Sequence, residues 1–216
     1  MRIVFEKRKA FSRKAVVLVP LVSFMISLVL TAILLAIFNT NPFETFAAMY
    51  MGAFGSWPNF TETLVKATPL MLTGLGVLIA FRLKFWNIGA EGQLTSGGIA
   101  ATWVVLFWSP GLPDWTVLPM AIIVGMLAGA LWAGIPAFLK VRLKVDEVLT
   151  TLMLNYVAIL FAEHLYYGPW RDPKGFGFPG TPPFPDFAWL PRIAGRAHMG
   201  LIFAIVLAVV IWFILN

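Results

Sequence analysis

The densest group of polar side chains in this apolar chain lies between Trp86 and Leu94, where the sequence reads WNIGAEGQL. Two amides, Asn87 and Gln93, flank the carboxylate of Glu91, and a glycine stands on each side of that carboxylate. Glycines loosen a helix and let another backbone approach closely. Two interpretations stay open: a broken helix beside a translocation path, or a polar helix start with Glu91 near the positive end of the helix dipole.

A second polar group follows in residues 144–156, which read KVDEVLTTLMLNY. Asp146 can cap a helix that begins after it, and Glu147 complements the dipole of that helix. Glu147, Thr151 and Asn155 are spaced four apart, so they share one helix face. A polar face of this kind meets a neighbouring helix or a pore rather than lipid. Packing is the favoured role for Thr151, whereas Asn155 fits packing and a pore position equally well.

Three glycines, Gly125, Gly129 and Gly134, are separated by larger side chains in one apolar run. Small residues one helical turn apart let two helix backbones approach closely in a membrane. We therefore assign these glycines to helix packing and not to ligand binding.

The composition places these groups in a membrane protein. Apolar residues make up 60% of the 216 residues and charged residues only 12%, whereas soluble domains carry about 25% charged residues. The net charge of +6 comes from short basic clusters between apolar runs, which is typical of membrane loops and not of nucleic-acid binding. The absence of cysteine and the presence of only two histidines argue against a metal site and a thiol nucleophile. No phosphate-binding loop occurs either, so we expect no bound cofactor and no ATP hydrolysis by this chain.

The hydropathy pattern predicts an all-α, polytopic transmembrane helical bundle with about six spans. A helix needs about 20 apolar residues to cross a bilayer. The first apolar run is longer than the apolar region of a signal peptide and lacks a small-residue cleavage site, so we expect a retained helix there. The predicted spans are 15–38, 63–81, 88–107, 116–139, 148–167 and 200–215.

Basic residues give the expected orientation. Residues 1–14 carry six Lys or Arg side chains, and further basic residues follow at 82–84 and 140–144. The connectors 39–60 and 109–115 carry none. The positive-inside rule then places the N-terminus in the cytoplasm. The predicted organisation is a basic cytoplasmic segment (1–14) followed by a membrane domain (15–216).

The connector at 168–199 is rich in proline and glycine, which disfavours regular helix. On the expected orientation this loop is extracytoplasmic. Its aromatic side chains suit a cap at the membrane interface, and a docking surface for an external partner is the alternative. The span at 200–215 is shorter than the bilayer core, so we expect the membrane domain to be incomplete at its C-terminus.

Four sequence runs resemble the permeases of ABC importers for nucleosides and simple sugars. They are TPLMLTGLG (68–76), WNIGAEGQ (86–93), WAGIPAFLK (132–140) and DEVLTTLMLNY (146–156). The same superfamily includes permeases for ribose-type sugars and branched-chain amino acids. The resemblance covers about residues 15–165.

This resemblance implies a multi-pass protein of the plasma (inner) membrane that forms the translocation path. It also implies a second permease subunit, a cytoplasmic ATP-binding subunit that binds the ATP, and an extracytoplasmic substrate-binding protein. Because nucleosides and sugars are neutral, we expect Asn87 and Gln93 to contact the substrate. We expect Glu91 to be structural, with its carboxylate held by backbone donors at the helix start.

Two other functions are alternatives to an ABC permease. A secondary transporter or channel usually places ionisable residues in mid-span, and here only Glu163 is a candidate. A purely structural membrane subunit is the third interpretation. Within the ABC permeases, a branched-chain amino acid substrate is the alternative to a nucleoside or sugar.

Overall fold

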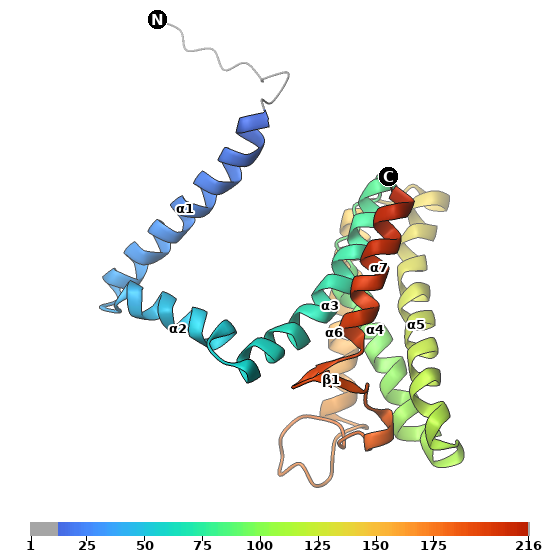
Figure 1. Ribbon diagram of the computed structural model, residues 1–216. Helices are drawn as coiled ribbons and strands as arrows, with labels where there is room; N and C mark the ends of the chain where they lie inside the picture. The colour runs from blue at the N-terminus through green and yellow to red at the C-terminus, as the bar shows by residue number, and fades with distance from the viewer. Residues whose placement is uncertain (1–12, 216) are drawn as a thin grey trace, which may run out of the picture. The chain divides into compact units, whose positions relative to one another are not determined.

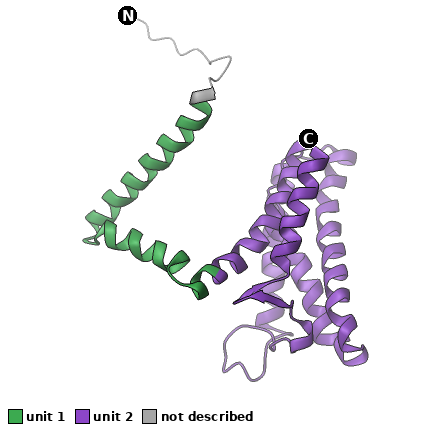
Figure 2. Cartoon of the chain, viewed as in Figure 1, with its two compact units in different colours: residues 1–60 green, residues 61–216 purple. Residues whose placement is uncertain are grey.

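The computed structural model describes residues 13–215, and most of the basic segment 1–14 therefore lies outside the described residues. The chain divides into two compact units, residues 1–60 and 61–216 (Figure 2). The division falls within the first turn of helix α3 (Trp57–Arg82).

The first unit contains α1 (Arg13–Ile37) and α2 (Pro42–Phe54). The apolar part of α1 is long enough to cross a bilayer, in agreement with the predicted span. Helix α2 was not predicted, because residues 39–60 were treated only as a connector. Its start is encoded locally: Asn41 Oδ1 accepts a hydrogen bond from Phe43 N at 3.0 Å, and Asn41 Nδ2 donates to Glu44 at 3.0 Å. Pro42 occupies the first helical position, where its missing N–H costs nothing.

The second unit is a helical bundle built from α3, α4 (Ala90–Trp103), α5 (Asp114–Leu143), α6 (Glu147–Tyr167) and α7 (Gly200–Leu215) (Figure 1). A π-helical turn, η1 (Val104–Trp108), and a 3₁₀ turn, η2 (Ser109–Gly111), follow α4. Four helices of the described chain are long and apolar enough to span a membrane, namely α1, α3, α5 and α6. The predicted membrane helical bundle is confirmed. The two other expected spans coincide with shorter helices, α4 and α7.

Helix α4 packs against both α5 and α6. Its contact with α5 is made through backbone atoms, because a Cβ on Gly97 would lie 2.9 Å from the carbonyl oxygen of Gly125. Towards the end of α4 that adjoins η1, Val104 and Val105 pack with Val117 from α5 in a small buried cluster. The bundle is therefore held by close backbone approach at one level and by branched apolar side chains at another.

The connector 168–199 contains no α-helix, as predicted. It forms a 3₁₀ turn, η3 (Asp186–Ala188), and a two-stranded antiparallel hairpin, β1 (Arg192–Ala194) with β2 (Ala197–His198). The turn of the hairpin lies against α3. Arg196 N donates to Thr61 Oγ1 at 3.3 Å, and Arg196 Nε lies 3.0 Å from Glu62 Oε2. The connector is thus an ordered cap on the end of the bundle that includes Thr61.

The expected orientation can be tested by labelling single cysteines in a chain that has none of its own. Phe176 in the connector is 98% exposed, and Leu143 at the end of α5 is 62% exposed. Because the basic residues cluster near Leu143, we expect it on the cytoplasmic side. Phe176→Cys should react with an impermeant maleimide in intact cells, and Leu143→Cys only after permeabilisation. The opposite labelling pattern would reverse the orientation.

Candidate translocation-path site

The chain is non-helical between α3 and α4. Helix α3 ends at Arg82, Lys84 adopts a left-handed conformation with φ 56°, and residues 85–89 have no regular structure before α4 begins at Ala90. We call residues 83–89 the α3–α4 linker. A segment of this kind survives at membrane depth only where other protein groups satisfy its backbone.

Asn155 of α6 satisfies two of those backbone groups. Its Oδ1 accepts a hydrogen bond from Gly92 N at 2.7 Å, and its Nδ2 donates to the carbonyl oxygen of Ile88 at 2.8 Å. The residue that precedes α4 is Gly89, which has no side chain to cap the helix. Asn155 therefore supplies from another helix the acceptor that a capping side chain usually provides at the third helical position.

The face of α6 that carries Asn155 continues toward the start of the helix with two more polar side chains. Thr151 Oγ1 accepts a hydrogen bond from Ile88 N at 3.3 Å, and the Glu147 carboxylate interacts with the backbone of Trp86. We call Glu147, Thr151 and Asn155 the polar rail. Spaced four apart on α6, these side chains meet successive parts of the linker and the start of α4. The rail holds the linker through side-chain-to-backbone contacts.

Glu147 is itself paired with Lys140 near the end of α5. The Lys140 ammonium also lies 3.5 Å from the carbonyl oxygen of Lys84 and 5.0 Å from the centre of the Phe85 ring. This ion pair was not predicted from the sequence, where Glu147 was assigned to the helix dipole and to the polar face of its own helix. Lys140 and Glu147 are seven residues apart on two helices, and only the tight turn between α5 and α6 brings them together.

Thr151 and its neighbour Thr150 offer a matched test of the rail. Both hydroxyls bond to carbonyls of their own helix, but only Thr151 also accepts from the linker. We expect Thr151→Val to lower the free energy of unfolding by about 1–2 kcal/mol more than Thr150→Val, because Ile88 N loses its acceptor. Thermal unfolding of the purified variants in detergent measures this difference. Equal stability would reduce Thr151 to a packing residue.

Asn87 and Gln93 form an amide pair across the start of α4. Gln93 Nε2 donates to Asn87 Oδ1 at 3.1 Å, and Asn87 Nδ2 donates to Gln93 Oε1 at 3.3 Å. Asn87 Oδ1 also accepts from Gly89 N at 2.9 Å. Only an oxygen can accept from that N–H, so the backbone determines which way both amides face.

The structure separates the predicted site residues into two groups. Asn87 and Gln93 contact each other, and Asn155 contacts the backbone of Ile88 and of Gly92. Glu91 lies in the first turn of α4 and is exposed. The backbone bonds expected for its carboxylate are not found among the described residues, and that expectation was wrong. The donor of Gly92 goes to Asn155 instead, so Glu91 retains only its favourable position near the helix dipole.

The predicted packing glycines also differ from one another. A Cβ on Gly125 would lie 3.1 Å from the Gly97 carbonyl oxygen, and one on Gly129 would lie 3.1 Å from the Gln93 carbonyl oxygen. Both glycines of α5 therefore lie directly against the backbone of α4. Within the described chain, a Cβ built on Gly134 would have no atom of another helix within 4 Å, so this glycine makes no such close contact.

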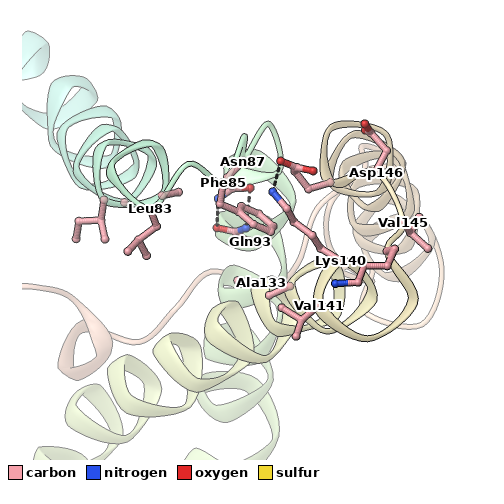
Figure 3. A pocket seen from close by; sticks show the side chains of 15 residues that line it. Leu83, Phe85, Asn87, Gln93, Ala133, Lys140, Val141, Val145 and Asp146 are labelled. Carbon is pink, nitrogen blue, oxygen red and sulfur yellow. Dashed lines mark hydrogen bonds and ion pairs between the residues drawn. The ribbon is translucent and has the colours of Figure 1, made fainter.

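A cavity of about 920 Å³ lies beside the amide pair (Figure 3). Its wall includes the end of α3, the linker, the start of α4, the end of α5 and the start of α6. Figure 3 shows the Asn87 and Gln93 amides facing each other, with Lys140 reaching toward the same region from α5. The motif singled out in the sequence is thus part of the wall of a hollow at one end of the bundle.

Comparisons with known proteins identify the family. Residues 59–216 match the family described as branched-chain amino acid transport system / permease component. The chain is 36% identical to a glucose ABC transporter permease of Haloferax volcanii, over 84% of this chain and 47% of that protein. It is 33% identical to the guanosine ABC transporter permease NupP of Bacillus subtilis, over 92% of this chain and 58% of that protein. No solved structure matches the chain.

A third relative is the nucleoside ABC transporter permease NupB of Lactococcus lactis, which is 35% identical over 70% of this chain and 41% of that protein. The chain spans about half the length of the curated relatives it matches. All three are named as ABC permeases for a nucleoside or glucose, which does not favour the secondary-transporter and branched-chain amino acid alternatives. With its apolar membrane helices, the chain is a multi-pass membrane protein that belongs to the ABC permease family of the nucleoside and sugar type.

Proposed function

We propose that this chain forms part of the translocation path of an ABC importer for a nucleoside or a simple sugar. The observation that carries the proposal is the similarity to a glucose permease and a guanosine permease over more than four fifths of the chain. The site is compatible with such substrates, because its central polar groups are the uncharged amides of Asn87 and Gln93. Uncharged amides bond hydroxyl and amide groups without stripping water from a full charge.

Transport by such a permease needs partners. We propose a separate cytoplasmic ATP-binding subunit, a second permease subunit and an extracytoplasmic substrate-binding protein. The support is the membership of an ABC permease family together with the absence of a phosphate-binding loop from the sequence. ATP would bind to the partner subunit and not to this chain.

Uptake in the source organism tests the proposal. Disruption of the gene should abolish uptake of labelled guanosine or labelled glucose, and the intact gene should restore it. Uptake should fail when ATP is depleted, even if a proton gradient is maintained, because the energy comes from ATP. Labelled leucine serves as the comparator for a branched-chain amino acid substrate.

Three outcomes would contradict the proposal. Loss of leucine uptake alone would favour the amino acid alternative. Uptake that persists without ATP but collapses with a protonophore would favour a secondary transporter. Unchanged uptake of all three compounds would leave the chain with a structural role.

A further inference from the structure

The cavity beside the amide pair has the size and lining of a small-molecule site. Its volume of about 920 Å³ lies within the range of about 300–1,000 Å³ that is typical of ligand pockets. Most of the wall is aliphatic and comes from α3, the linker and α5, including Ile79, Leu83 and Val141. A ligand in this open cavity would contact apolar side chains along its wall and meet polar groups at one edge.

The amide pair leaves hydrogen-bonding capacity at that edge. Asn87 Oδ1 already accepts two hydrogen bonds, and each amide nitrogen gives one N–H to the pair. In the part of the chain that the structure describes, the second N–H of each amide and one lone pair of Gln93 Oε1 have no further partner. The pair therefore offers two donors and one acceptor, held in fixed positions by the Gly89 backbone.

The charges in the wall balance. Lys140 and Lys144 contribute two positive charges, and Asp146 and Glu147 contribute two negative charges. Lys140 pairs with Glu147, and the Asp146 carboxylate accepts a hydrogen bond from Leu149 N at 2.9 Å. The lining side chains therefore offer an anionic ligand no excess of positive charge, and such a ligand would lose its hydration on entry. This balance favours a neutral ligand over a phosphorylated one.

From these observations, we infer that the cavity binds a neutral ring compound through adjacent hydroxyl or amide groups that hydrogen-bond to the Asn87–Gln93 pair. This inference rests on the proposed function and deepens it, since it names the contact residues and excludes phosphorylated forms of the substrate. Guanosine and glucose both carry the required chemistry. The polar rail is a positioning element in this site, because it holds the linker that carries Asn87.

Equilibrium binding tests the inference on the full chain, purified and reconstituted in lipid nanodiscs. The probes are labelled guanosine and labelled glucose, each measured directly, with guanosine monophosphate as the charged competitor. Gln93→Leu removes the polar atoms of the side chain and leaves a somewhat shorter apolar one. Ala137→Phe fills the cavity from α5 without changing a polar group. Glu91→Gln is the matched control, because Glu91 is exposed two residues before Gln93 and does not line the cavity.

We expect the wild-type chain to bind at least one probe. Gln93→Leu should weaken that binding by about tenfold, since one or two neutral hydrogen bonds are lost. Ala137→Phe should weaken it by at least as much, and Glu91→Gln should leave it unchanged. Guanosine monophosphate should compete at least about tenfold less well than guanosine.

Several results would overturn the inference. They are wild-type binding of neither probe, unchanged binding in both Gln93→Leu and Ala137→Phe, and equal competition by the monophosphate. If Gln93→Leu does not fold, Ala137→Phe and the competition experiment still decide. If uptake depends on the gene as proposed but the cavity variants bind normally, the cavity is not the binding site and the proposed function still holds. Intact binding without uptake of either compound would refute the proposed function alone.

Discussion

Gly92→Ala is expected to remove most of the folded protein. A Cβ at this position would lie 2.8 Å from Asn155 Oδ1, 2.9 Å from Asn155 Cα and 3.1 Å from the carbonyl oxygen of Leu154. The Asn155 Cα and the Leu154 carbonyl oxygen are backbone atoms of α6, so a change of side-chain rotamer cannot relieve the overlap. Separating α4 from α6 would also break the 2.7 Å bond from Gly92 N to Asn155. We expect a combined cost of about 2–5 kcal/mol.

Gly98→Ala is the control, because Gly98 lies in the same helix and a Cβ built there would have no described atom of another helix within 4 Å. Alanine is favoured over glycine in a helix by about 1 kcal/mol, so this variant should be as stable as the wild type or more so. The measurement is the fraction of monodisperse protein after detergent extraction, together with the midpoint of thermal unfolding. Similar yields for the two variants would show that α4 and α6 separate readily at Gly92.

The second large effect is expected for Asn155→Leu. Asn155 is only 8% exposed, and leucine has the same branched arrangement of side-chain heavy atoms, is bulkier and carries no polar atom. The carbonyl oxygen of Ile88 and the N–H of Gly92 would both lose their partner. A buried backbone group left unpaired costs about 1–3 kcal/mol, so the two together should cost about 2–6 kcal/mol. The linker should also become accessible to proteolysis, because its main attachment to α6 is gone.

Tyr156→Phe is the control for Asn155→Leu. It removes a polar atom from the next residue of α6, whose side chain is 59% exposed, and should leave stability unchanged. Limited proteolysis in nanodiscs, followed by mass mapping of the cut sites, measures opening of the linker. Wild-type protection of residues 83–89 in Asn155→Leu would show that other contacts hold the linker and that Asn155 faces a pathway instead.

The positions of the helices could be predicted because lipid imposes a simple rule on composition. Long apolar runs with few charges marked α1, α3, α5 and α6, and their observed ends lie within a few residues of the prediction except at the start of α3 and the end of α5. Helix α2 was missed because its sequence shows no clear amphipathic pattern and because it is too short to span a bilayer. The signal that could have identified it is the sequence Asn41-Pro42-Phe43-Glu44, which combines a capping residue with proline at the first helical position.

The site was predictable in its members but not in its connections. Asn87, Gln93 and Asn155 are polar residues in an apolar sequence, and this contrast identified them as candidate site residues. Their partners depend on contacts between α4 and α6 across more than 60 residues of sequence, such as Asn155 with Ile88. Helical spacing places Asn155 and Thr151 on one face, but it does not say which segment that face meets. For the same reason the sequence suggested local backbone donors for Glu91, whereas the key donor is taken by a distant side chain.

The glycine contact between α4 and α5 has a consequence for how the protein is made. Helix α4 has only 14 residues, and among them are a glutamate, a glutamine and three glycines. Such a segment gains little by leaving the translocon for lipid alone, because it is shorter than the roughly 20 apolar residues that cross a bilayer and its first half is polar. We therefore expect α4 to enter the bilayer only together with α5, because the backbone of α4 packs directly against Gly125 and Gly129 of α5. We expect the translocon to release α4 and α5 together as a helical hairpin. A larger residue at Gly125 should then prevent α4 from inserting into the membrane during synthesis.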